Sequence, residues 1–325
     1  MSILPIKKEI LNYYKSIPKC ELHAHLNGSI RESTLRSLLK ANGTTISGHI
    51  FDSYHNRTLS ECFTLFDLIH KVTNSTEVIS KITREMVEDF SAENCKHLEI
   101  RTTPRSLRDC TSEEYVDLII NEIQNSHAVK SKQMNVSLVL SINRGSHDLN
   151  DAFRVVEIAT KKRIVSGIDF SGNPFKGKFA DFLPAFQLAR KKNLKTTLHF
   201  AEKMDPQESM KMLDFVPDRI GHANYLNQEI RERLLEMKIP LEICLSSNVA
   251  TESVKSYQLH HLSCWVKNDY PVVICTDDLG IFRTSLSKEY AFAEQYTKIP
   301  RKLLTQIAKK SFQYKFPKLV LPKLY

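Results

Sequence analysis

The stretch "ELHAHLNGS" places His23 and His25 two residues apart, at the end of an apolar run that leads into Asn27 and Gly28. In a β-strand, residues i and i+2 project to the same face, so both imidazoles could reach one ion. Neutral imidazole is a common ligand of zinc, and a catalytic zinc site keeps one position open for water. Two hydrogen-bonded histidines near a strand end would produce the same pattern. The motif by itself leaves both interpretations open.

Three later segments carry further groups of this kind. "LHFAEK" has His199 and then Glu202, which combines a possible metal ligand with a possible acid or base. "RIGHA" ends another apolar run with His222, and "VICTDD" ends a fourth with Asp277 and Asp278. Each segment also has a structural interpretation as core histidines, a turn histidine or a helix N-cap. Their joint occurrence at the ends of four apolar runs favours a metal site.

The elements that must position these groups are short apolar runs, which start near residues 20, 97, 136, 165, 195, 219, 241 and 272. Longer amphipathic segments separate them. "EVISKITREMVEDF" has apolar residues at helical spacing, and "TSEEYVDLIINEI" opens with a capping box formed by Thr111 and Glu114. Strands that alternate with helices predict parallel βα units.

Eight such units predict an α/β fold of the (β/α)8 TIM-barrel type, and an open doubly wound sheet is the alternative. The barrel is favoured because nearly every run ends in a polar group, and the carboxyl ends of barrel strands converge on one pocket. No glycine-rich phosphate loop follows the first run, as a dinucleotide-binding sheet would require. The segment from 30 to 96 is too long for one helix, so extra helices are expected between the first and second strands.

Composition limits the remaining possibilities. The 325 residues include 42% hydrophobic residues, which is enough for one large core, and we expect one domain over residues 1–325. Seven cysteines form no CxxC pair and predict reduced core residues. The net charge of +9 is spread along the chain. No signal peptide or membrane span is apparent, so a soluble, cytoplasmic protein without a membrane or nucleic-acid partner is expected, most simply a monomer.

These motifs resemble the adenosine deaminase family of the amidohydrolase superfamily. The matching segments are "ELHAHLNGS", "RTLSECF", "IRTTPR", "GIDFSGNP", "LHFAEK", "DRIGHA", "LEICLSSN" and "VICTDDLGIF", in family order. "HLNGS", "RTTPR" and "CLSSN" are most similar to the adenosine deaminase-like branch, which acts on N6-methyl-AMP. The resemblance implies zinc-dependent hydrolysis of an N6-substituted purine nucleoside monophosphate to IMP and an amine.

The resemblance also implies roles for individual residues. One zinc ion per chain would be held by His23, His25, His199 and Asp277. Glu202 would be the proton donor, His222 would orient or deprotonate the attacking water, and Asp278 would bond the purine at N7. A binuclear barrel of this type would carry a bridging lysine after its fourth strand, but Lys161 and Lys162 precede that strand, so one metal is expected.

Contacts with the nucleotide follow from matching positions: His25, Asn27, His70, Thr102, Thr103, Pro104, Arg105, Asn143, Gly172, Glu202 and Asp278. Arg57 and Thr58 are further phosphate candidates, although a surface charge and a helix start explain them equally well. His70 lies on a helical pattern and could be a packed helix face. Where the family often has Asp after "SI", this chain has Asn143, and "SGNP" and "HANY" replace the more usual "SGDP" and "HGTF".

Two alternatives remain at this stage. The enzyme could act on adenosine or AMP and release ammonia. A protein of another class, which binds nucleic acid through its positive charge and uses its histidines structurally, would bind less tightly as salt increases. The lack of a localised basic and aromatic stripe counts against this second alternative. The paired His260 and His261 have no ligand spacing to the strand ends and are expected to be structural.

Overall fold

The computed structural model describes residues 5–43 and 58–318. All eight predicted runs form strands: β1 (Lys19–His25), β2 (Cys95–Thr102), β3 (Asn135–Asn143), β4 (Val165–Ser171), β5 (Lys195–Phe200), β6 (Arg219–His222), β7 (Leu241–Ile243) and β8 (Val272–Ile274). They pair in parallel and in sequence order, from β1 to β8. The predicted α/β barrel is therefore confirmed, and the open doubly wound alternative is wrong.

The barrel is nearly closed between β8 and β1. A parallel bridge joins Ala24 to Asp277, where the Asp277 amide donates to the His23 carbonyl at 2.8 Å. The His25 amide donates in turn to the Asp277 carbonyl at 3.1 Å. The backbone at this seam thus places Asp277 directly beside the His-x-His pair.

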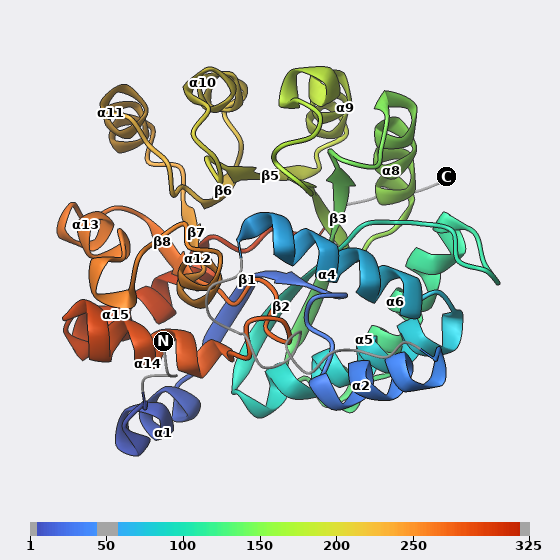
Figure 1. The fold of residues 1–325 in the computed structure, drawn as a ribbon, viewed down its shortest axis with the longest axis horizontal. Coiled ribbons are helices and arrows are strands. Elements are labelled where there is room, and N and C mark those ends of the chain that lie inside the picture. Colours follow the sequence, from blue (N-terminus) through green and yellow to red (C-terminus); the bar gives the residue numbers. More distant parts are fainter. Residues whose placement is uncertain (1–4, 44–57, 319–325) are drawn as a thin grey trace.

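Helices surround the strands (Figure 1). Those between and after the strands are α6 (Ser112–Asn125), α7 (His127–Lys130), α8 (Leu149–Lys161), α9 (Phe179–Lys191), α10 (Pro206–Phe215), α11 (Gln228–Met237), α12 (Leu245–Ala250), η1 (Tyr257–Leu259), α13 (Leu262–Lys267), α14 (Leu286–Thr297), α15 (Arg301–Lys310) and η2 (Ser311–Gln313). α1 (Lys8–Ser16) precedes the barrel and packs near α14. The predicted capping box at Thr111 and Glu114 is present at the start of α6.

The predicted extra helices also lie between the first two strands: α2 (Glu32–Ala41), α4 (Leu59–Val72) and α5 (Thr76–Ala92). Figure 1 shows α4 crossing the face of the barrel in front of β1 and β2. Its residues Leu65 and Ile69 are buried in the core, whereas Phe63, Phe66 and His70 line the cavity at the barrel mouth. α4 therefore forms part of the cover over the site.

Each strand alternates between two environments. In β2, Leu98 and Ile100 belong to the hydrophobic core between strands and helices. Glu99 and Arg101 are equally buried but make ion pairs across the barrel interior. The period of two along a strand thus fills the interior with polar side chains and leaves the outer face apolar.

The seven cysteines are all free thiols, as predicted, and five of them are buried. Cys110 and Cys264 are partly exposed, so the prediction of core residues is wrong for these two. No helix in the described ranges is both long and apolar enough to cross a membrane.

Candidate active site

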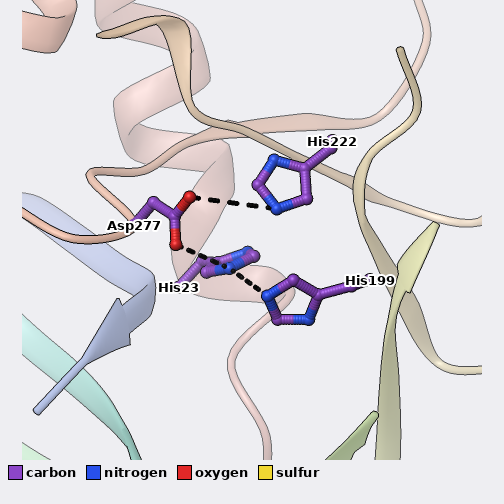
Figure 2. A group of neighbouring side chains, drawn as sticks. All are labelled: His23, His199, His222 and Asp277. Carbon is purple, nitrogen blue, oxygen red and sulfur yellow. Dashed lines mark hydrogen bonds and ion pairs between the residues drawn. The ribbon is translucent and has the colours of Figure 1, made fainter. Parts of the chain in front are cut away.

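Four side chains from distant parts of the chain meet at the carboxyl ends of the strands. His23, His199, His222 and Asp277 each place a ligand atom within 4.8 Å of the others (Figure 2). The strands explain this convergence, because His199 is the penultimate residue of β5, His222 ends β6 and Asp277 follows β8. Such a buried group is a candidate metal-binding site.

His25 joins the same group from the end of β1. Its Nε2 atom lies 3.3 Å from Nε2 of His23, 3.1 Å from Nε2 of His199 and 3.5 Å from Oδ1 of Asp277. His23 Nε2 is 3.2 Å from His199 Nε2 and 3.5 Å from Asp277 Oδ1. The structure thus brings together all four residues that the sequence analysis assigned to the metal.

The far sides of three of these ligands contact a second residue. His23 Nδ1 is 2.9 Å from the Glu242 carboxylate, and His199 Nδ1 is 3.1 Å from that of Asp169. The remaining carboxylate oxygen of Asp277, Oδ2, accepts a hydrogen bond from the Ser247 hydroxyl at 2.7 Å. The hydrogen bond from Nδ1–H to Asp169 leaves Nε2 of His199 to face the site, whereas His23 Nδ1 contacts Glu242 without hydrogen-bond geometry.

Two of these histidines have pKa values displaced in opposite directions. Burial lowers the pKa of His25 to about 3, so this ring is neutral at physiological pH. Burial would also lower the pKa of His199, but the Asp169 carboxylate beside it raises the pKa to about 9. A metal ion that binds His199 at Nε2 would displace the proton there and leave Nδ1–H on Asp169.

Close packing explains two glycines of the motifs. A Cβ atom on Gly28 would lie 1.6 Å from Oδ1 of Asp278, and one on Gly221 would lie 2.8 Å from Cε1 of His23. His222 and Asp277 themselves adopt left-handed backbone conformations, with φ of 65° and 61°. Such conformations are unfavourable for residues with a side chain and concentrate at functional sites.

Glu202 and His222, which the sequence analysis assigned to the reaction, lie beside the proposed metal ligands. Glu202 Oε1 and Asp277 Oδ2 are each 3.9 Å from Nε2 of His222. Among the described residues, Glu202 Oε2 and His222 Nε2 are buried without a hydrogen-bond partner. Unpaired buried polar atoms are rare and costly, so both are positioned for a ligand.

Burial also changes how these groups ionise. Burial raises the pKa of Glu202, and the nearby Asp277 carboxylate adds to this effect. The pKa of Asp278 is raised well above its usual value by burial and by Asp277. Burial lowers the pKa of His222 well below its usual value. Burial therefore favours the protonated form of both carboxyl groups and the neutral form of the imidazole.

The site opens into a cavity of about 530 Å³. Most residues predicted to contact substrate line it: His25, Asn27, His70, Thr102, Thr103, Arg105, Asn143, Gly172, Glu202 and Asp278. Pro104 is buried within the same segment. Thr58 is not among the lining residues and instead caps α4 through a capping box with Glu61, and Arg57 lies outside the described residues.

Arg105 has a structural task as well as a place in the cavity wall. Its guanidinium donates to the carbonyl and the hydroxyl of Thr73, at 2.8 and 3.0 Å, and to the carbonyl of His70 at 3.4 Å. These contacts attach the C-terminal end of α4 to the loop after β2. The helix that covers the site is thus tied to a predicted substrate-binding segment.

Sequence reasoning missed several residues of the site. Glu242 and Asp169 lie inside apolar runs, and only their inward position in the strand alternation could have indicated them. Lys176 lines the cavity from the loop after β4, and Asn248 lines it from α12, although it belongs to the quoted "CLSSN" motif. Glu242, Asp169 and Asn248 each contact a histidine far away in the chain, which no local pattern reveals.

Comparisons with known proteins agree with this geometry. The family model for adenosine deaminase matches residues 18–318. The N6-mAMP deaminase of Arabidopsis thaliana is 40% identical over 312 residues, which cover 87% of this chain and 88% of that protein. The N6-methyl-AMP deaminase of Homo sapiens is 34% identical over 322 residues, covering 94% and 90%. The crystal structure of Arabidopsis ADAL complexed with IMP superposes with a TM-score of 0.89, at 39% identity and 94% coverage of both chains.

A parallel barrel with a buried histidine and aspartate group at the carboxyl ends of its strands is typical of metal-dependent hydrolases, and that group is a candidate metal-binding site. The chain belongs to the adenosine deaminase family. It is therefore a deaminase-family enzyme, as the motifs predicted.

Proposed function

We propose that the protein hydrolyses N6-methyl-AMP to IMP and methylamine, with one zinc ion held by His23, His25, His199 and Asp277. The substrate assignment is supported by relatives named for this activity, at 34–40% identity over most of the chain, and by a relative crystallised with IMP. The observation that carries the proposal is the spacing of the four ligand atoms.

That spacing fits zinc. Ligands about 2.0–2.1 Å from a tetrahedral zinc ion stand roughly 3.3 Å apart. The Nε2 atoms of His23, His25 and His199 lie 3.1 to 3.3 Å apart, and Asp277 Oδ1 lies 3.5 Å from Nε2 of both His23 and His25. His222 Nε2, at 3.9 Å from Asp277, lies at the edge of this group and has no partner there. We therefore assign His222 to the reacting water and His25 to the metal.

When bound, zinc lowers the pKa of its coordinated water to about 7 and so supplies a hydroxide nucleophile at neutral pH. Glu202 contributes the acid. Its raised pKa favours the protonated carboxyl group, which would deliver a proton to N1 of the purine as C6 becomes tetrahedral. Protonation of N1 removes the electron density that would otherwise resist attack on an aromatic ring.

Asp278 orients the base. N7 of a purine is a hydrogen-bond acceptor, so its partner must donate. An ionised aspartate can only accept, but the raised pKa of Asp278 favours the protonated form, which can donate. Collapse of the tetrahedral carbon then expels methylamine and leaves the 6-oxo group of IMP.

The phosphate would lie at the outer end of the cavity. Thr103 and Arg105 line it there, as the resemblance implied, and Lys176 adds a second cation. Arginine can bind a phosphate through two parallel hydrogen bonds, whereas lysine acts as a point charge. These groups favour a nucleotide over a free nucleoside.

Chromatographic assay of AMP, N6-methyl-AMP, adenosine and N6-methyladenosine, with zinc measured on the same sample, tests the proposal. We expect about one zinc per chain and conversion of N6-methyl-AMP to IMP, with AMP a poor substrate. Deamination of adenosine with N6-methyl-AMP left intact would support the adenosine alternative instead. Affinity for nucleic acid that survives chelation of the metal would support the nucleic-acid alternative.

A further inference from the structure

His222 is connected to a backbone amide 40 residues further along the chain by three hydrogen bonds. The Leu262 amide donates to Nδ1 of His260 at 3.1 Å. Nε2 of His260 lies 3.2 Å from Oδ1 of Asn248, and Nδ2 of Asn248 lies 3.1 Å from Nδ1 of His222. His222, Asn248 and His260 are at most 3% exposed. We call these contacts the Leu262–His222 chain.

The direction of each bond follows from the first one. A backbone N–H can only donate, so Nδ1 of His260 must be the acceptor and carries no proton. Neutral His260 then has its proton on Nε2 and donates to the oxygen of Asn248. The amide group of Asn248 is thereby oriented with its NH2 toward His222, where it donates to Nδ1. The tautomer of His222 is set by this sequence of donors.

The consequence lies at the reaction centre. With Nδ1 occupied as an acceptor, neutral His222 carries its proton on Nε2, the atom that faces Glu202 and Asp277 without a partner. Burial, which lowers the pKa of His222 and of His260, agrees with neutral rings. An imidazole in this state offers a hydrogen-bond donor at Nε2 and has no lone pair there to take a proton.

We propose that Asn248 and His260 are positioning residues which hold His222 as the Nε2–H tautomer, so that His222 donates a hydrogen bond to the attacking oxygen and does not act as its base. The inference rests on the proposed function for the identity of that oxygen. A nucleophile that is already hydroxide needs only to be held on the correct face of the purine. A preformed donor aimed at the reacting oxygen does this without reorganisation.

The tautomer is measured directly by 15N NMR of histidine-labelled, zinc-loaded protein, with the His222 signals assigned by their loss in His222→Gln. We expect a pyrrole-type signal for Nε2 and a pyridine-type signal for Nδ1 in His222, and the same pattern in His260. The opposite pattern in wild-type His222 would overturn the proposal, whatever the activity of the sample.

Asn248→Asp replaces the NH2 group that donates to His222 with a carboxylate oxygen of similar size. The carboxylate can then accept hydrogen bonds from both His222 and His260. We expect the His222 signals to exchange, so that Nδ1 becomes protonated, and kcat to fall about 100-fold with little change in KM. Exchanged signals with unchanged kcat would overturn the assigned role of His222. Unexchanged signals would overturn the control of its tautomer by Asn248.

Two substitutions of His260 form a matched pair of variants. His260→Gln keeps an N–H donor for Asn248 and should retain the wild-type tautomer and nearly all activity. His260→Leu removes the donor and should lower kcat about 10- to 100-fold. Equal loss in both variants would show that His260 only fills space. Thermal unfolding and zinc content verify that each variant is folded and loaded.

Failure of the proposed function is distinguishable from failure of this inference. Wild-type protein that holds zinc but converts no purine nucleotide would contradict the former. The NMR pattern of His222 would still decide whether the Leu262–His222 chain sets its tautomer.

Discussion

Two polar regions fill the interior of the barrel, and they differ in how completely their charges are paired. The first is the charged layer of Glu99, Arg101, Arg219 and Glu242, in the middle of the strands. Glu242 forms ion pairs with both arginines, and Glu99 pairs with Arg219. The second is the rim, where Glu202 Oε2 and His222 Nε2 are buried without a partner in the described parts of the chain.

This difference distinguishes buried polar groups that stabilise the fold from buried polar groups that are available to bind a ligand. In the charged layer, the arginines hold the pKa of Glu242 well below its usual value despite burial. At the rim, burial raises the pKa of Glu202 although the charges of His199 and Arg144 oppose this shift. Burying a polar group without a partner is costly, so the rim is stable as built only if a ligand supplies the missing bonds.

The two regions are also joined. Glu242 contacts His23, and Asp169 contacts both Arg101 and His199. The paired layer thereby serves as a rigid base that orients the metal ligands above it.

Glu202→Gln should have the largest effect and should separate the two regions most clearly. We expect kcat to fall about 10³- to 10⁴-fold, because the amide cannot donate a proton to N1. Zinc content and thermal stability should be retained, because Glu202 is not a proposed metal ligand and its Oε2 atom has no hydrogen-bond partner among the described residues. Appreciable residual turnover, or loss of zinc, would place Glu202 outside the proposed acid role.

Arg219→Met should show the opposite behaviour. It leaves Glu99 and Glu242 short of a buried cation, and breaking such a pair costs about 3–5 kcal/mol of unfolding free energy. Denaturant unfolding measures the loss. A variant as stable as the wild type would mean that the charged layer is not a structural element.

Glu289 in α14 tests an intermediate case, because the described residues that donate hydrogen bonds to its carboxylate are neutral groups. Oε2 accepts from the Ser246 amide at 3.0 Å, and Oε1 accepts from the Thr284 hydroxyl. Burial raises its pKa to about 7 from 4.5. Its contribution to stability is therefore complete below about pH 4.5 and is lost as the pH rises through about 7.

Glu289→Gln should remove this dependence. From pH 4.5 to above 7, the variant should gain stability relative to the wild type by about 3 kcal/mol, on the order expected from a shift of this size. Unfolding free energies measured across this range provide the test. Parallel curves for the two proteins would show that Glu289 does not titrate in the window.

Lys176→Ala should have the smallest effect, because this lysine is exposed at the outer end of the cavity. An exposed charge pair contributes up to about 1 kcal/mol, which corresponds to about a 5-fold higher KM for N6-methyl-AMP with kcat unchanged. Lys178→Ala, two residues away and outside the cavity lining, is the matched control. Equal effects of both variants would indicate only general electrostatic attraction.

Much of the fold and part of the site could be predicted from local patterns. The apolar runs gave all eight strands because a strand is recognised from a few consecutive residues. Convergence of the strand ends predicted a joint site of His23, His25, His199, His222 and Asp277, and the family resemblance selected the four metal ligands among them. A helix start was the alternative interpretation of Thr58 from the local sequence. The structure supports it, because Thr58 caps α4.

Tertiary structure alone decided how these side chains are supported. Glu242 reaches His23 from the opposite end of the chain, and Asp169 reaches His199 from the neighbouring strand. His260 was expected to be structural because nothing near it in the sequence indicates a ligand, yet it contacts Asn248, which contacts His222. The direction of a hydrogen bond and the pairing of a buried charge depend on atoms brought together from separate elements, so no periodicity along the chain can encode them.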